Sequence, residues 1–104
     1  MRIENTPQFE RAFERLLNCD QNFYTLNTIT QFYSKYKQIR LLVQENPLLG
    51  QREPILEGFK LEYRRIVIRP YFKIIYTIKG DTIYFADIWD TRRDPNNLKS
   101  RIPT

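Results

Sequence analysis

The residues best suited to chemistry are basic and aromatic side chains in the second half of the chain. They lie on or directly after predicted strands and are Tyr63, Arg65, Tyr71, Lys73, Arg92 and Arg93. Arginine binds phosphate groups through forked hydrogen bonds, and tyrosine rings stack on unpaired bases. This combination suits single-stranded RNA. The alternative is a solvated strand face on a basic protein.

A second candidate is Glu53, in the segment 50–56 that leads into the strands. A carboxylate beside positive charge stays ionised, so Glu53 is suited to accept a proton as a general base. The alternative is an exposed loop carboxylate that pairs with Arg52 or Arg64. Both interpretations stay open on these residues alone.

The third candidate is the run 88–95, which carries two adjacent arginines at the end of a strand. Arg92 and Arg93 can clamp a phosphate or stabilise a pentacovalent transition state. Asp90 and Asp94 can equally neutralise them in a structural ion-pair cluster. Neither role is favoured by the spacing.

Composition excludes several kinds of site. The chain has no histidine, which excludes a Ser-His-Asp triad, a Cys-His pair, a histidine general base and His-based zinc sites. Cys19 is the single cysteine, which excludes an intrachain disulfide and a thiolate zinc cluster, and no basic neighbour marks it as a nucleophile. The sequence contains no phosphate-binding or dinucleotide-binding glycine pattern. We therefore expect no metal and no cofactor.

The chain as a whole reads as one small domain. Its 104 residues, at 12.7 kDa, leave room for a single core, so residues 1–104 are expected to form one unit. The N-terminus has no apolar segment typical of a signal peptide, and no apolar run approaches the roughly 18 residues that span a bilayer. The expected location is the reducing cytoplasm, with no membrane partner.

Two helices are predicted in residues 1–50, after a short strand at 2–5. Thr6-Pro7 begins the first helix as N-cap and first helical residue. Its apolar stripe is Phe9, Phe13, Leu16 and Leu17. After a break at 18–22, the second helix runs from about Phe23 to Glu45, where Asn46-Pro47 ends it. Its predicted stripe is Leu26, Ile29, Tyr33, Tyr36, Ile39, Leu42 and Val43.

Three strands are predicted at 61–69, 71–79 and 82–91, with turns at Pro70 and Gly80-Asp81. In the middle strand, alternation turns Phe72, Ile74, Tyr76 and Ile78 toward the helices and leaves Tyr71, Lys73, Ile75, Thr77 and Lys79 facing outward. The third strand alternates too poorly to assign its faces, although Trp89 is predicted to anchor the core or its rim. The predicted fold class is α+β, with a helical hairpin packed on one face of a small antiparallel sheet.

Positive charge is concentrated in the half of the chain that forms the sheet and the tail. The net charge is +5. Residues 1–50 carry six basic and five acidic residues, whereas residues 51–104 carry eleven basic and seven acidic ones. An excess of this kind favours a polyanion or an acidic protein as partner.

Four strings in residues 46–95 closely resemble the RelE/ParE superfamily, the small toxins of type II toxin–antitoxin modules (plasmid stabilisation systems). They are Asn46-Pro47-Leu48-Leu49-Gly50 with Glu53-Pro54, Tyr63-Arg64-Arg65-Ile66, Phe72-Lys73-Ile74-Ile75-Tyr76, and the run from Ile88 to Pro95. Residues 6–45 match only in helical layout. The resemblance implies a RelE/ParE-like fold and a cognate antitoxin partner that binds through an acidic or amphipathic segment.

The resemblance implies two alternative activities. RelE-like members are ribosome-dependent, metal-independent endoribonucleases that cleave mRNA and inhibit growth, whereas ParE-like members inhibit DNA gyrase. A degenerate member that retains only antitoxin binding is a third possibility. The nuclease interpretation is preferred, because the matches at Glu53 and Lys73 lie on the face that alternation marks as open.

The nuclease interpretation assigns residues to a site. The catalytic candidates are Glu53 as general base, Arg65, Lys73 and Arg92, and the candidates for binding RNA or phosphate are Tyr63, Arg64, Arg69, Tyr71 and Arg93. The chain departs from the family at Asp90-Thr91, where relatives often carry histidine, and no tyrosine follows Tyr84. A missing general acid costs about 10²- to 10⁴-fold in rate.

Overall fold

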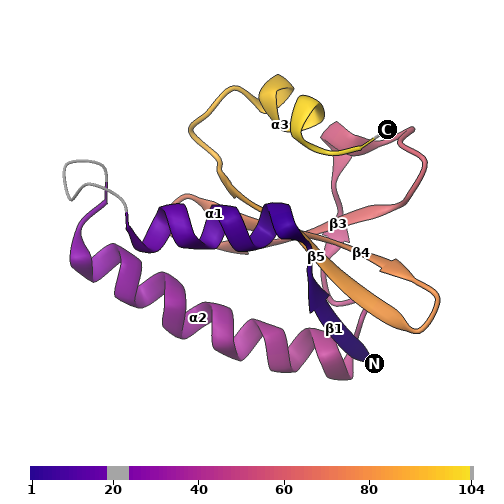
Figure 1. Cartoon of the computed structure of the whole chain (residues 1–104), viewed down its shortest axis with the longest axis horizontal. Helices are drawn as coiled ribbons and strands as arrows, with labels where there is room; N and C mark the ends of the chain where they lie inside the picture. The colour runs from indigo at the N-terminus through magenta and orange to yellow at the C-terminus, as the bar shows by residue number, and fades with distance from the viewer. Residues whose placement is uncertain (19–23, 104) are drawn as a thin grey trace.

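A central sheet with helices on both faces organises the structure, a computed structural model that describes residues 1–18 and 24–103. In chain order its elements are β1 (Arg2–Asn5), α1 (Pro7–Leu17), α2 (Leu26–Glu45), β2 (Gln51–Arg52), the 3-10 turn η1 (Pro54–Leu56), β3 (Tyr63–Ile68), β4 (Phe72–Lys79), β5 (Thr82–Asp90) and α3 (Pro95–Arg101). Figure 1 shows α1 and α2 alongside each other and the short α3 apart from both. Cys19 and the predicted helix start at Phe23 lie outside the described residues.

The sheet has the order β1-β5-β4-β3-β2. The predicted meander of β3, β4 and β5 is antiparallel, and the turn at Gly80 has the positive φ of 63° that glycine tolerates. β1 lies parallel to β5, so the first half of the chain contributes a strand to the sheet of the second half. The predicted α+β class is confirmed, with a sheet that is mixed at one edge.

α1 begins where the sequence predicts and α2 ends at Glu45 as predicted, but α2 begins at Leu26 rather than at about Phe23. Parts of both predicted stripes are also wrong. The Thr6 side chain accepts a hydrogen bond from the Phe9 amide and caps α1, whose buried residues are Phe9, Ala12 and Leu16. Leu17 is 47% exposed. In α2 the buried residues are Phe32, Tyr36 and Val43, whereas Leu26, Tyr33 and Leu42 are exposed. The stripe is therefore rotated toward Phe32, because that side meets Phe72 of the sheet.

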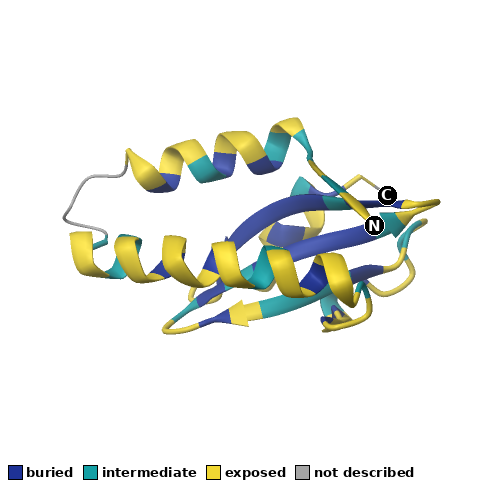
Figure 2. Cartoon of the chain, turned by 90° about the horizontal axis from the view of Figure 1, so that it is seen from below, coloured by how far each residue is buried: buried dark blue, intermediate teal, exposed yellow. Residues whose placement is uncertain are grey.

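The face of the sheet toward α1 and α2 carries the larger core. Its members include Phe72, Ile74 and Tyr76 of β4, with Ile78 packed against it, as alternation predicts. Figure 2 shows the buried middle strands of the sheet and the exposed outer sides of the helices. The remaining core residues are Phe9, Ala12, Leu16, Phe32, Tyr36, Val43, Ile68, Ile83, Phe85 and Ile88.

A β-bulge in β5 explains why that strand alternates poorly. Ile75 lies opposite Asp87 and Tyr76 lies opposite Phe85, so Ala86 is an extra residue in the pairing. Beyond the bulge the parity of the strand changes. Phe85 and Ile88 consequently pack toward the long helices, although they are three positions apart.

The sequence predicts that the opposite face of the sheet is open. This prediction is wrong, because that face carries a second core. Ile75 and Thr77 are buried there, beneath η1 and α3. The segment predicted to be a basic tail folds into α3, which begins with an Asp94 side-chain cap on the Asn96 amide. The second core consists of Leu56, Tyr63, Ile75, Ala86, Trp89, Leu98 and Ile102.

Candidate functional site

Glu53 is the centre of a buried ion-pair cluster on the α3 side of the sheet. It lies between β2 and η1, where its amide donates to the Tyr63 carbonyl at 2.9 Å, and its side chain is only 2% exposed. Arg65 of β3 donates from Nη1 to Glu53 Oε2 at 2.7 Å, and Lys73 of β4 donates from Nζ to Glu53 Oε1. The carboxylate is therefore held by one cation on each oxygen.

The loop before Glu53 is fixed by a close approach between Gly50 and Tyr76. The Gly50 amide donates to the Tyr76 hydroxyl at 2.8 Å, and that hydroxyl donates to the Pro47 carbonyl at 2.7 Å. A Cβ on Gly50 would lie 2.7 Å from a Tyr76 ring carbon and 2.8 Å from the Arg65 carbonyl oxygen. Only glycine fits this position, so the close packing of Gly50 fixes the loop that carries Glu53 beside β3.

The geometry of the cluster suits acid–base chemistry next to bound phosphate. A buried carboxylate is stable when it is paired and hydrogen-bonded, and Glu53 has two such partners. The Arg65 side chain is 28% exposed and the Lys73 side chain 13% exposed, so the cations form the solvent-facing side of the cluster. An incoming phosphate can share their hydrogen-bond donors while the carboxylate remains available to accept a proton.

Arg92, the fourth predicted catalytic residue, makes its contacts in a different cluster. Its guanidinium binds Asp90 through Nε at 3.1 Å and Nη2 at 2.7 Å, and it stacks 3.6 Å from the centroid of the Tyr71 ring. The hydroxyl of Tyr24 donates to Asp90 Oδ2 at 2.8 Å. The structure thus brings together Glu53, Arg65 and Lys73, and it holds Arg92 against Asp90 instead.

The contacts between Asp90, Arg92 and Tyr24 shift the pKa of each of the three side chains. Burial raises the pKa of Asp90, but hydrogen bonds from Arg92 and Tyr24 outweigh burial and hold that pKa below its ordinary value. The Asp90 carboxylate in turn raises the pKa of Arg92. Burial and the bond to Asp90 raise the pKa of Tyr24 to about 12. Sequence reasoning missed Tyr24, because no local pattern links a residue before α2 to the end of β5.

Two predicted RNA-binding residues do not lie on an open surface. Tyr63 is 6% exposed, because η1 and the residues after it cover its ring, and Phe59 meets it edge-on. Arg64 lies on the opposite face from Arg65, where it donates to the Gly50 carbonyl at 2.6 Å and pairs with Glu62 at 2.9 Å. The prediction for Tyr63 is wrong because the face that it shares with Arg65 is covered at that position. The prediction for Arg64 overlooks that alternation turns it away from Arg65.

The other predicted phosphate-binding residues are accessible to different degrees. Arg69 is exposed at the end of β3, and Tyr71 is half-buried beneath Arg92. Arg93 is exposed, and its guanidinium lies 4.6 Å from the centroid of the Trp89 ring. Trp89 is 1% exposed, which confirms its prediction as a core anchor.

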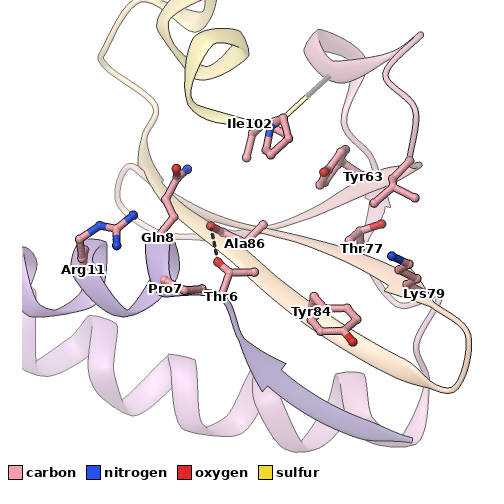
Figure 3. A pocket seen from close by; sticks show the side chains of 12 residues that line it. Thr6, Pro7, Gln8, Arg11, Tyr63, Thr77, Lys79, Tyr84, Ala86 and Ile102 are labelled. Atoms are coloured by element: carbon pink, nitrogen blue, oxygen red, sulfur yellow. Dashed lines mark hydrogen bonds between the residues drawn. The ribbon is translucent and has the colours of Figure 1, made fainter.

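One sizeable cavity lies away from the Glu53 cluster. It measures about 540 Å³ and lies between the start of α1, the strands β3 to β5 and the C-terminal segment. Figure 3 shows Arg11 on the α1 side and Lys79 on the strand side of a largely apolar surface. None of the predicted catalytic residues lines it.

Residues 1–18 and 24–103 contain neither a cluster of metal ligands nor a membrane-spanning helix. No group of three or more Cys, Asp or Glu side chains in these segments is arranged to hold a metal ion. No helix in the same segments combines the length and the apolar character needed to cross a membrane.

Comparison with solved structures identifies the fold. YafQ from E. coli strain BL21(DE3) is 20% identical, with a TM-score of 0.58 over 88% of this chain and 96% of that one. The E. coli DinJ–YafQ complex gives 20% identity and a TM-score of 0.57, covering 88% of this chain and 96% of the other. The conserved hypothetical protein HP0894 from Helicobacter pylori gives 17% identity and a TM-score of 0.55, covering 89% and 97%. No family model and no curated protein sequence matches the chain. The chain therefore shares its fold with YafQ and HP0894.

Proposed function

We propose that this protein is the toxin of a type II toxin–antitoxin pair and acts as a RelE-like, ribosome-dependent mRNA endoribonuclease. The observation that carries the proposal is the Glu53 carboxylate held between Arg65 and Lys73 on adjacent strands. The fold shared with YafQ supports the same class of protein.

The proposed reaction uses the RNA's own 2′-hydroxyl as nucleophile. Glu53 accepts the 2′-hydroxyl proton while the 2′-oxygen attacks the adjacent phosphorus and the bond to the 5′-oxygen breaks. Arg65 and Lys73 bind the non-bridging oxygens, where negative charge increases in the transition state. Since the chain has no histidine, we assign protonation of the leaving 5′-oxygen to the Lys73 ammonium. The products are a 2′,3′-cyclic phosphate and a 5′-hydroxyl.

An antitoxin is the proposed protein partner. YafQ, which shares the fold of this chain, forms a complex with DinJ, and this supports a protein partner for the present chain. The net charge of +5 on this chain favours a partner segment that carries acidic residues.

The nuclease proposal is tested by brief induction of the gene and mapping of mRNA ends, together with cleavage in a translating extract. Glu53→Gln and Lys73→Gln are each expected to reduce cleavage by about 10²-fold or more, the scale of a lost acid or base. Lys79→Gln is the matched control, because Lys79 is an exposed lysine on the same strand as Lys73. Since Arg92 is bound to Asp90, Arg92→Ala is expected to reduce cleavage less than either.

Circular dichroism on each variant separates lost chemistry from lost folding. Folded Lys73→Gln protein that cleaves mRNA as fast as wild type would contradict the site. Inhibition of gyrase supercoiling without new mRNA ends would instead identify a ParE-like toxin. Unaffected growth on induction would leave antitoxin binding as the remaining function.

A further inference from the structure

A small hollow between α1 and α3 is lined by arginines from three separate parts of the chain. They are Arg15 of α1, Arg93 in the loop after β5 and Arg101 at the end of α3. The hollow measures about 110 Å³ and lies beside β5 at Ile88 and Asp90, beyond the stretch 82–85 that pairs with β1. Among the described residues no strand covers the part of the sheet edge on which it opens.

The charges around this hollow do not cancel. Asp90 accepts hydrogen bonds on both carboxylate oxygens from Arg92 and a further one from Tyr24. Arg101 pairs with the buried Asp87. Among the described residues no ion pair involves Arg15 or Arg93, so these two positive charges have no acidic partner within that part of the chain.

The size of the hollow limits its occupant. A cavity needs roughly 10–15 Å³ to hold one water molecule. The hollow, at about 110 Å³, therefore admits a tetrahedral oxyanion and some of its hydrating water but not a nucleoside. Leu16, Phe72 and Ile88 contribute apolar lining, so the positive charge that recognises an anion comes from the three arginines. Guanidinium groups bind phosphate by paired, charge-assisted hydrogen bonds.

We propose that the hollow rimmed by Arg15, Arg93 and Arg101 is a binding site for a single phosphate group, distinct from the Glu53 cluster. A phosphomonoester carries about −1.5 to −2 charge at neutral pH, which matches the two positive charges of Arg15 and Arg93. The phosphate is either free in solution or the terminal group of an RNA. This inference does not depend on the proposed cleavage reaction.

Trp89 provides a direct reporter. It is the single tryptophan of the chain, and the guanidinium carbons of Arg93 and Arg101 lie 4.6 Å and 5.7 Å from the centroid of its ring. Titration with inorganic phosphate at constant ionic strength is expected to change its fluorescence with saturation, whereas chloride is expected to leave it unchanged. Broadening of the phosphorus NMR signal of phosphate provides a second readout that does not depend on the tryptophan.

Arg11 and Arg15 form a matched pair, because both are exposed and lie one turn apart on α1, yet only Arg15 lines this hollow. Arg15→Gln and Arg93→Gln are expected to weaken binding by about tenfold or more each, whereas Arg11→Gln is expected to leave it unchanged. A short RNA with a 5′-phosphate, compared with the same RNA with a 5′-hydroxyl, distinguishes the two sources of phosphate. Absence of saturation by inorganic phosphate and by the phosphorylated RNA, or equal weakening by Arg11→Gln and Arg15→Gln, would overturn the proposal.

Discussion

Glu53 and Asp90 are both carboxylates bound by arginine, and their other contacts separate their roles. Glu53 is bound by two cations that reach it from β3 and β4, so an entering phosphate has two donors to share. Asp90 is bound by Arg92, two residues away, and by the Tyr24 hydroxyl. Asp90 therefore joins the segment before α2 to the end of the sheet, which is a structural task.

The Tyr24–Asp90 hydrogen bond predicts a specific loss of stability in alkali. The pKa of Tyr24 is raised to about 12 by burial and then by Asp90, against about 10 in an unfolded chain. Above about pH 10 the unfolded state loses this proton first, so the stabilisation is complete below that pH and is lost as pH rises toward about 12. Urea unfolding across this range is expected to show a smaller loss of stability for Tyr24→Phe than for wild type.

Tyrosine NMR provides the control for that prediction, since burial also raises the pKa of Tyr63 and Tyr76. Asp90→Asn is expected to lower the pKa of Tyr24 only part of the way toward its ordinary value, because burial is the larger cause. If wild type and Tyr24→Phe lose equal stability between neutral pH and about pH 12, ionisation of the Tyr24 hydroxyl is not coupled to folding.

For single residues, the sequence predicts on which side of the sheet a side chain lies better than it predicts which residues that side chain contacts. Alternation places Arg65 and Lys73 on the same side of the sheet, and the structure agrees. The burial of Glu53 depends on Gly50 packing against Tyr76, which is 26 residues away, and no local pattern contains that contact. The same limit explains why the pairing of Glu53 with Arg65, rather than Arg52 or Arg64, was not predicted.

Among the elements that the sequence does not predict, α3 is longer than β2 and η1. Its seven residues contain a single buried apolar side chain, Leu98, so its hydrophobic periodicity is too short to detect. It is stabilised instead by Arg101, which donates to the buried Asp87 at 2.8 Å from Nε and 2.7 Å from Nη2. The β5 bulge at Ala86 is hidden in the same way, since an extra residue disturbs the alternation on which strand facing depends.

The anchoring of α3 predicts the cost of removing Arg101. Asp87 is fully buried, and burial raises its pKa even with Arg101 in place. Loss of one partner of a buried ion pair typically costs about 3–5 kcal/mol, so Arg101→Ala is expected to reduce the free energy of unfolding by roughly 3 kcal/mol. Urea denaturation provides the measurement.

Lys99→Ala is the control for that measurement, because Lys99 is exposed on the same helix. It is expected to change stability by no more than about 0.5 kcal/mol. A similarly small effect of Arg101→Ala would mean that Leu98 and Ile102, rather than the ion pair, hold α3 on the sheet.

For the whole molecule, the central fact is that one sheet is shared by two cores. Ile74 of β4 belongs to the core under α1 and α2, and its neighbour Ile75 belongs to the core under η1 and α3. The sequence predicts the first core because long helices and alternating strands repeat over many residues. It does not predict the second, which is covered by η1 and α3, two short segments far apart in the chain. The Glu53 cluster lies on that second side, so its surroundings were the least predictable part of the molecule.

This arrangement predicts that the two cores unfold together. Trp89 reports on the core under α3, whereas far-ultraviolet circular dichroism is dominated by α1 and α2 on the other face. Because β4 and β5 contribute to both cores, neither core can lose its packing while the other keeps an intact sheet. Urea unfolding followed by tryptophan fluorescence and by circular dichroism is expected to give the same midpoint and slope, as in a two-state transition. An earlier fluorescence midpoint would show instead that η1 and α3 detach from a sheet that the long helices hold by themselves.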